Sequence, residues 1–158
     1  MNIKDFFKLV AAIAIAQAAG LIGSLYTYPE IAGWYRTLER SPLTPPDYVF
    51  GPVWTALYAL MGIAAYLVWK EGLDRFRVKV ALGLFLFQLA INSLWSIVFF
   101  NLHDPEGALA ILILLIVLII ATMVAFARVS RVAAWLLTPY LLWCSFALYL
   151  NYSIVILN

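Results

Sequence analysis

Residues 107–127 read GALAILILLIVLIIATMVAFA, a run of 21 residues without a charge between Glu106 and Arg128. A helix rises about 1.5 Å per residue, so about 20 apolar residues are enough to cross the hydrocarbon core of a bilayer. From Ile111 to Ile120 the run is almost wholly aliphatic, which is typical of a wall that faces lipid. This stretch predicts a transmembrane helix.

Four further uncharged stretches of similar length divide the rest of the chain. Continuous hydrophobicity of this length does not fit the alternating pattern of a transmembrane barrel. The sequence therefore predicts an all-α membrane protein, a single domain over residues 1–158. Its five transmembrane helices are expected at about 9–28, 48–69, 80–101, 107–127 and 132–155.

The composition excludes several classes of protein. Hydrophobic residues make up 66% of the chain and charged residues 11%, whereas a soluble domain is typically about 25% charged. A net charge of +2 is too small for a surface that tracks nucleic acid. One cysteine, Cys144, and one histidine, His103, cannot build a metal cluster. We expect no cofactor, and we interpret His103 as a solvated helix-end residue rather than a haem ligand.

The distribution of Lys and Arg predicts the orientation in the membrane. Eight of these ten residues lie at the N-terminus, in residues 70–79 or in residues 128–131. Only Arg36 and Arg40 lie in the other connections. Because cytoplasmic loops carry the excess of positive charge, we expect a cytoplasmic N-terminus, with the first loop and the C-terminus on the outer side.

The N-terminal stretch has a second interpretation. Lys4 and Lys8 precede an apolar run that ends near Ala16-Gln17-Ala18, as in a cleaved signal peptide. We expect a retained helix instead. Small residues recur every four positions in it, and such a face serves packing within one bundle or a dimer contact. They are Ala12, Ala16, Gly20 and Ser24.

The predicted helices contain no Asp, Glu, Lys or Arg, and the one histidine, His103, lies just at the end of the third. Ion-coupled transporters usually carry such a group inside the membrane, and their folds usually show internal repeats. Five helices do not divide into two equal halves. These features argue against a proton- or sodium-coupled carrier.

The first loop, residues 29–50, is longer than the roughly 2–8 residues that usually join neighbouring helices. It is rich in aromatic residues, and the Pro45-Pro46 pair should make it stiff and extended. We expect it to act as a lid over the outer end of the bundle. The alternative is an interfacial segment, because Trp and Tyr favour the depth of the lipid headgroups.

Polar and aromatic side chains share one face on three of the helices. They are Trp54 and Tyr58; Gln88, Asn92, Trp95, Ser96 and Phe99; and Tyr140, Trp143, Ala147 and Asn151. An amide in hydrocarbon needs a partner, so Gln88 and Asn92 should point inward, Gln88 only to join helices. The indoles of the second, third and fifth helices, together with Asn92, are expected to surround one cavity under the loop. Flat indole faces favour a planar, lipid-soluble ligand.

At these residues the sequence resembles the translocator protein family, also called the tryptophan-rich sensory protein family. The matching motifs appear in family order and at family spacing across residues 26–152. They are Trp34-Tyr35, Thr44-Pro45-Pro46, Trp54-Thr55-Ala56-Leu57-Tyr58, Gln88-Leu89 with Asn92 and Trp95, and Pro139-Tyr140 with Trp143 and Asn151. Leu43 stands where the family usually has a tryptophan.

The resemblance implies a five-helix bundle with a ligand pocket closed by the first loop, and often a homodimer. Its implied ligands are porphyrins such as protoporphyrin IX, isoquinoline carboxamides and benzodiazepine drugs. Carried over position by position, the pocket uses Tyr35, Pro45, Pro46, Phe50, Trp54, Asn92, Trp95, Ser96, Trp143 and Ala147.

A receptor or sensor for tetrapyrroles is the function that we expect. One alternative, implied by the resemblance, is an enzyme that degrades porphyrin with light and oxygen through the tryptophans Trp54 and Trp143. Another is a passive transporter or a partner-binding scaffold. The chain offers no acid–base pair or metal site for conventional catalysis.

Overall fold

The computed structural model describes residues 2–158, and this part of the chain is helical without any strand. Its segments are α1 (Ile3–Ile31), α2 (Trp34–Thr37), α3 (Asp47–Trp69), α4 (Phe76–Ser96), the π-helix η1 (Ile97–Asn101), α5 (Pro105–Ala127), α6 (Arg131–Leu136) and α7 (Thr138–Leu157).

Five of these rods are long and apolar enough to cross a bilayer, when α4–η1 and α6–α7 are each counted as one. They contain 23 to 29 residues each. The predicted five-helix membrane fold is therefore confirmed, and the chain is a multi-pass membrane protein. The helices extend beyond the predicted windows at several ends. α1 begins at Ile3 rather than near residue 9, and α4 at Phe76 rather than near residue 80.

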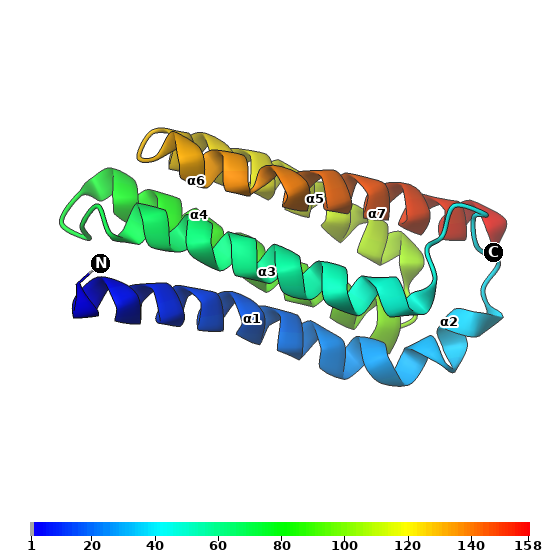
Figure 1. The fold of residues 1–158 in the computed structure, drawn as a ribbon. Helices are drawn as coiled ribbons and strands as arrows, with labels where there is room; N and C mark the ends of the chain where they lie inside the picture. Colours follow the sequence, from blue (N-terminus) through cyan, green and yellow to red (C-terminus); the bar gives the residue numbers. More distant parts are fainter. Residues whose placement is uncertain (1) are drawn as a thin grey trace.

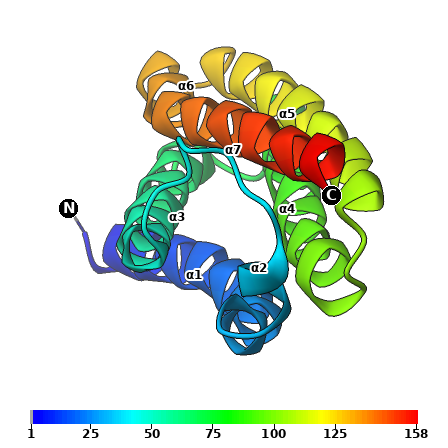
Figure 2. The ribbon, with the colours of Figure 1, turned by 90° about the vertical axis from the view of Figure 1, so that its right-hand side faces the viewer.

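The rods lie side by side along one direction (Figure 1). Seen from one end, they form a closed ring in the order α1, α3, α6–α7, α5, α4 (Figure 2). α3 packs mainly against α1 and α6 and only sparsely against α7. The N-terminal end of α1 lies at the same end of the bundle as the α3–α4 and α5–α6 connections. The α2–α3 loop and the C-terminus lie at the other end (Figure 1).

Local side chains fix where the helices begin. The side chain of Asn2 accepts a 2.8 Å hydrogen bond from the backbone N–H of Asp5 at the start of α1. Asp104 caps α5 in the same way through the N–H of Gly107, and Pro105 supplies a preset φ at the first helical position. Each cap satisfies a backbone N–H that the helix itself leaves unpaired.

Small residues let α1 approach the neighbouring helices closely. Ala12 and Ala16 are buried, and a Cβ on Gly20 would lie 2.5 Å from the Tyr58 ring of α3. A Cβ on Gly62 of α3 would lie 2.5 Å from the Cα of Ile13. Three residues of the predicted stripe, Ala12, Ala16 and Gly20, thus serve packing inside the bundle, which is one of its two predicted uses. The fourth, Ser24, is exposed, and the neighbouring Gly23 is buried in its place.

The third transmembrane rod ends in a π-helix. In η1 the backbone N–H of Leu102 donates a 3.1 Å hydrogen bond to the carbonyl of Ile97, five residues earlier. The wider turn places Phe99 and Phe100 in succession in the buried interior. Such turns interrupt the regular helix and occur frequently beside functional sites.

Candidate ligand-binding site

A chain of hydrogen bonds joins three transmembrane rods in the interior. The Oδ1 atom of Asn92 accepts a 2.6 Å bond from the Tyr58 hydroxyl, and its Nδ2 donates a 2.9 Å bond to the Tyr140 hydroxyl. Tyr140 in turn donates a 2.7 Å bond to Oε1 of Gln88. All four residues are buried. The predicted inward orientation of Gln88 and Asn92 is confirmed, and Gln88 does connect helices.

An aromatic wall adjoins this polar chain between α3 and α7. The Trp54 indole stacks on the Tyr58 ring at a centroid distance of 5.5 Å and meets Tyr140 edge-on at 6.2 Å. One turn earlier in α3, Phe50 meets the Trp143 indole edge-on at 5.9 Å. Both indoles are half-buried and pack against the main core. The wall lies where α3 and α7 have few backbone contacts.

Trp95 belongs to a separate aromatic group near η1. Its indole N–H donates a 3.1 Å hydrogen bond to Oδ1 of Asn151, and its ring stacks on Phe99 at 5.2 Å. The side chain of Asn151 donates a further bond to the carbonyl of Pro105 at the start of α5. The N–H of Trp95 therefore already has a partner.

Tyr35 anchors the short helix α2 on this second group. Its ring lies 5.7 Å from Phe100 and 6.2 Å from Phe99. The guanidinium of Arg40 lies over the other side of the Tyr35 ring, 4.7 Å from its centroid. Burial raises the pKa of the Tyr35 hydroxyl, and Arg40 opposes that rise through hydrogen bonding and charge. The hydroxyl is therefore neutral at physiological pH.

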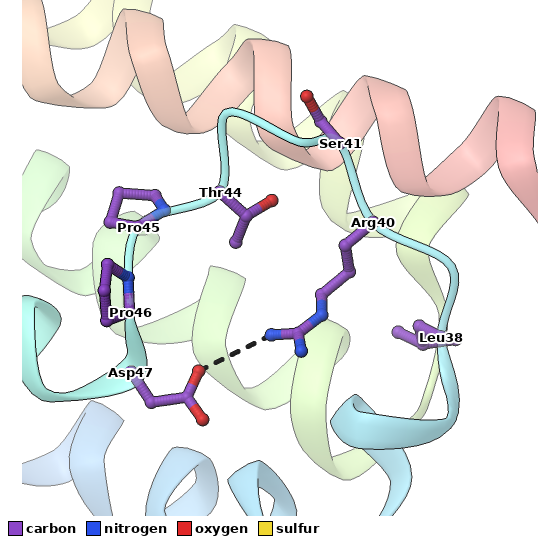
Figure 3. Close-up of a pocket in the computed structure, with 7 residues that line it drawn as sticks. All are labelled: Leu38, Arg40, Ser41, Thr44, Pro45, Pro46 and Asp47. Atoms are coloured by element: carbon purple, nitrogen blue, oxygen red, sulfur yellow. Dashed lines mark hydrogen bonds and ion pairs between the residues drawn. The ribbon is translucent and has the colours of Figure 1, made fainter.

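The α2–α3 loop itself frames an open cavity of about 640 Å³ (Figure 3). Arg40 and Asp47 reach across it toward each other from opposite arms of the loop, and Nη1 of Arg40 lies 3.5 Å from Oδ1 of Asp47. The remaining lining residues are Leu38, Ser41, Thr44, Pro45 and Pro46. The cavity thus has a cationic group, an anionic group and a stiff proline edge.

Two contacts fasten the loop to the last helix. The hydroxyls of Ser41 and Tyr149 share a 2.9 Å hydrogen bond. The side chain of Asn158 accepts from the backbone N–H of Glu39 and donates to its carbonyl, both at 2.9 Å. Neither contact was visible in the sequence, because each joins residues more than 100 positions apart.

Comparison with known proteins adds a second line of evidence. The TspO/MBR family pattern matches residues 12–157. The chain is 44% identical over 156 residues to the tryptophan-rich protein TspO of Chlorobaculum tepidum, covering 98% of each. It is 44% identical over 135 residues to the human translocator protein, covering 84% of this chain and 79% of the relative. It is 32% identical over 158 residues to protein CrtK of Rhodobacter capsulatus, covering 100% and 95%.

The chain belongs to the TspO/MBR family. The resemblance stated from the motifs is thus confirmed, and it extends over nearly the whole chain.

The ten residues carried over by that resemblance occupy several environments in this TspO/MBR protein. Pro45 and Pro46 line the loop cavity. Three others, Phe50, Trp54 and Trp143, form the aromatic wall, and Asn92 bonds to a tyrosine beside it. Trp95 and Tyr35 belong to the group at η1.

The last two lie apart from these groups. Ser96 is buried on the side of α1, where a Cβ on Gly23 would lie 3.0 Å from its Oγ. Ala147 is partly buried on α7 against the main core.

Three features of the candidate site could not be predicted from the sequence. Tyr58 and Tyr140 both bond to Asn92. Arg40 and Asp47 face each other in the loop cavity. The loop is also fastened through Tyr149. The one available signal was the position of Tyr58, one helical turn after Trp54 on the same face.

His103 lies outside the site, at the end of η1. It is exposed, has a φ of 52°, stacks on Trp34 at 4.4 Å and lies 3.0 Å from Oε2 of Glu30. Within residues 2–158 no three His, Cys, Asp or Glu side chains come together as metal ligands would.

Proposed function

We propose that this TspO/MBR protein is a membrane receptor or sensor for planar hydrophobic ligands, with porphyrins of the protoporphyrin IX type as the principal class. The ligand lies between α3 and α7, beneath the α2–α3 loop. The observation that carries the proposal is that Phe50, Trp54 and Trp143 meet in the sparsely packed seam between α3 and α7. The loop that carries Arg40 leads directly into α3, although none of these three aromatic residues lines the loop cavity.

The aromatic wall supplies shape and stacking. Phe50, Trp54 and Trp143 come from two helices with little backbone contact, so a flat guest can separate them without breaking a helix–helix interface. Offset stacking contributes about 0.5–1.5 kcal/mol for each aromatic pair. A ligand that arrives from lipid gains little from burial alone, because both environments are apolar. Stacking is therefore the main source of affinity in the seam.

The loop cavity supplies polarity. Arg40 is partly buried, lies over the Tyr35 ring and makes one long contact, of 3.5 Å, to Asp47, so it keeps N–H groups with which to bind an anion. A porphyrin with carboxylate side chains presents its ring to the wall and its carboxylates to Arg40. The same pocket accepts neutral planar drugs such as isoquinoline carboxamides through the wall alone.

The loop acts as a lid in this proposal. Its contacts to Tyr149 and Asn158 are hydrogen bonds at the rim, and each is worth about 1 kcal/mol. They are weak enough to break and re-form as ligand enters and leaves. The anchor of α2, Tyr35 against Phe99 and Phe100, stays in place during this motion.

The proposal includes a homodimer and an orientation with the loop outside. Of the charges at the end opposite the loop, eight are basic and three are acidic, while the loop end carries two basic and five acidic groups. The positive-inside rule then assigns the basic end to the cytoplasm. A single cysteine introduced at Leu43 or at Lys70 reports the side, because both positions are exposed and the natural Cys144 is buried. Chemical crosslinking in native membranes tests the dimer.

Titration of the purified protein with protoporphyrin IX tests the ligand assignment. We expect saturable quenching of tryptophan fluorescence, a rise in melting temperature and displacement by an isoquinoline carboxamide. Quenching that grows linearly and does not stabilise the protein would reject the proposal. The same titration under light and air tests the alternative of a porphyrin-degrading enzyme. A new absorbing product that forms with turnover, and does not form in detergent without the protein, would assign that activity instead.

A further inference from the structure

A second cavity, of about 420 Å³, lies at the end of the bundle opposite the loop. It opens where α4 begins beside the end of α5, its antiparallel neighbour. Two connections that are distant in sequence form it together. Its lining residues are Arg75, Phe76, Arg77, Val78, Arg128 and Val129.

Positive charge dominates this cavity. Arg75 lies 3.5 Å from Glu71, which partly neutralises it. Arg77 and Arg128 make no ion pair within residues 2–158. The first turn of α4 carries no acidic residue, and the two acidic residues just before it, Glu71 and Asp74, do not line the cavity. Arg77 at the start of α4 and Arg128 after the end of α5 therefore share one opening without an ion pair in the described part of the chain.

Apolar side chains lie directly beside these guanidinium groups. Phe76 is 79% exposed, and Val129 is half-buried at the same opening. An exposed phenyl ring beside cationic groups is typical of the boundary between the lipid headgroups and the hydrocarbon core, where both kinds of side chain find favourable surroundings. The cavity thus offers a cationic part and an apolar part side by side.

We propose that this cavity binds the headgroup of an anionic phospholipid. Arg77 and Arg128 hold the phosphate diester, because the planar guanidinium fork matches phosphate oxygens. The acyl chains then run along Phe76 and Val129 toward the lipid-facing surface of α4 and α5. Phe76 and Val129 distinguish this site from one for a free phosphate ion, because a free phosphate makes no apolar contacts.

The test compares lipids and variants in purified protein. Phosphatidylglycerol should remain bound and raise the melting temperature, phosphatidylcholine should do so much less, and inorganic phosphate at equal concentration should have no effect. The double variant R77Q/R128Q should bind phosphatidylglycerol roughly 10- to 30-fold more weakly, as expected for the loss of two cationic contacts near a membrane surface.

The matched control is K4Q/K8Q, which removes the same charge at the same end of the bundle but outside the cavity. It should change lipid affinity less than about threefold if the cavity, not the diffuse charge, binds the lipid. Equal losses in the two double variants would overturn the proposal. Stabilisation by inorganic phosphate as strong as that by phosphatidylglycerol would also overturn it and would indicate a free-anion site.

Discussion

The Tyr58 hydroxyl of α3 donates a 2.6 Å hydrogen bond to the side-chain oxygen of Asn92 in α4. The same amide also donates to Tyr140 of α7, so one residue joins three of the five rods. Removing the amide leaves the buried Tyr58 hydroxyl without its acceptor and takes away the donor to Tyr140, which keeps only its bond to Gln88. This residue therefore organises the bundle around the proposed ligand seam.

Replacing Asn92 with Leu should destabilise the protein. The loss of both hydrogen bonds is expected to lower the free energy of unfolding by about 1–3 kcal/mol. Thermal unfolding in detergent measures the effect as a lower melting temperature. S145A is the control, because the exposed Ser145 hydroxyl bonds only to the carbonyl of Leu141 in its own helix. If N92L is as stable as S145A, the three-helix junction does not support the fold.

Removing the two indole rings of the aromatic wall tests whether the wall binds the ligand. W54L combined with W143L should weaken protoporphyrin IX binding about 5- to 150-fold, because each lost stacking contact is worth about 0.5–1.5 kcal/mol. Fluorescence of the remaining tryptophans and thermal stabilisation measure the affinity. W135L is the matched control, since Trp135 is 73% exposed and belongs to neither aromatic group. Unchanged affinity in the double variant would place the ligand elsewhere.

The pair in the loop cavity predicts opposite effects of two charge changes. R40Q should weaken binding of protoporphyrin IX several-fold, because it removes the cation that faces the carboxylates. D47N should strengthen binding, because it frees Arg40 from its competing partner. The dimethyl ester of the same porphyrin should respond to neither change. R36Q is the control: Arg36 lies in α2, is exposed and does not line the cavity. If the affinities for the free acid and for the dimethyl ester change equally, Arg40 does not bind the porphyrin carboxylates.

The hydrogen bond between Ser41 and Tyr149 should affect the rates of loop opening and of ligand release. Y149F removes the hydrogen bond to Ser41 and should loosen residues 38–46, so that their backbone amides exchange with solvent faster. Ligand should also dissociate several-fold faster. Y152F serves as the control, because Tyr152 is exposed and donates no side-chain hydrogen bond in the described residues. Hydrogen exchange that is the same in the two variants would mean that the contact does not hold the loop.

The sequence predicted the helices because charges bound each apolar run, yet it placed several ends too far inward. Lys4, Lys8, Arg77 and Lys79 all lie within helices. Charged residues mark where the hydrocarbon ends, whereas a helix continues into the headgroup region for as long as its caps allow. The π-helix at Ile97–Asn101 was also missed, since one widened turn leaves no mark in composition or periodicity.

Only part of the candidate site could be predicted from the sequence. Helical periodicity placed Gln88 and Asn92 on one inward face, and both are buried there. It does not give the rotation of one helix relative to another. The partners Tyr58 and Tyr140, which lie 34 and 48 positions from Asn92, therefore appeared only in the structure. The resemblance named residues for the pocket but not Arg40 or Asp47, which line the loop cavity.

The close approach at Gly20 and Gly62 has a mechanical consequence. At these two positions there is no room for even a methyl group between α1 and α3. Sliding one helix along the other would drive larger neighbouring side chains into these contacts, and parting them would lose the contacts. A guest in the seam between α3 and α7 leaves this contact in place, because α1 and α7 pack on different flanks of α3. A larger residue at Gly62 would force α1 away from α3 and should destabilise the bundle without touching the seam.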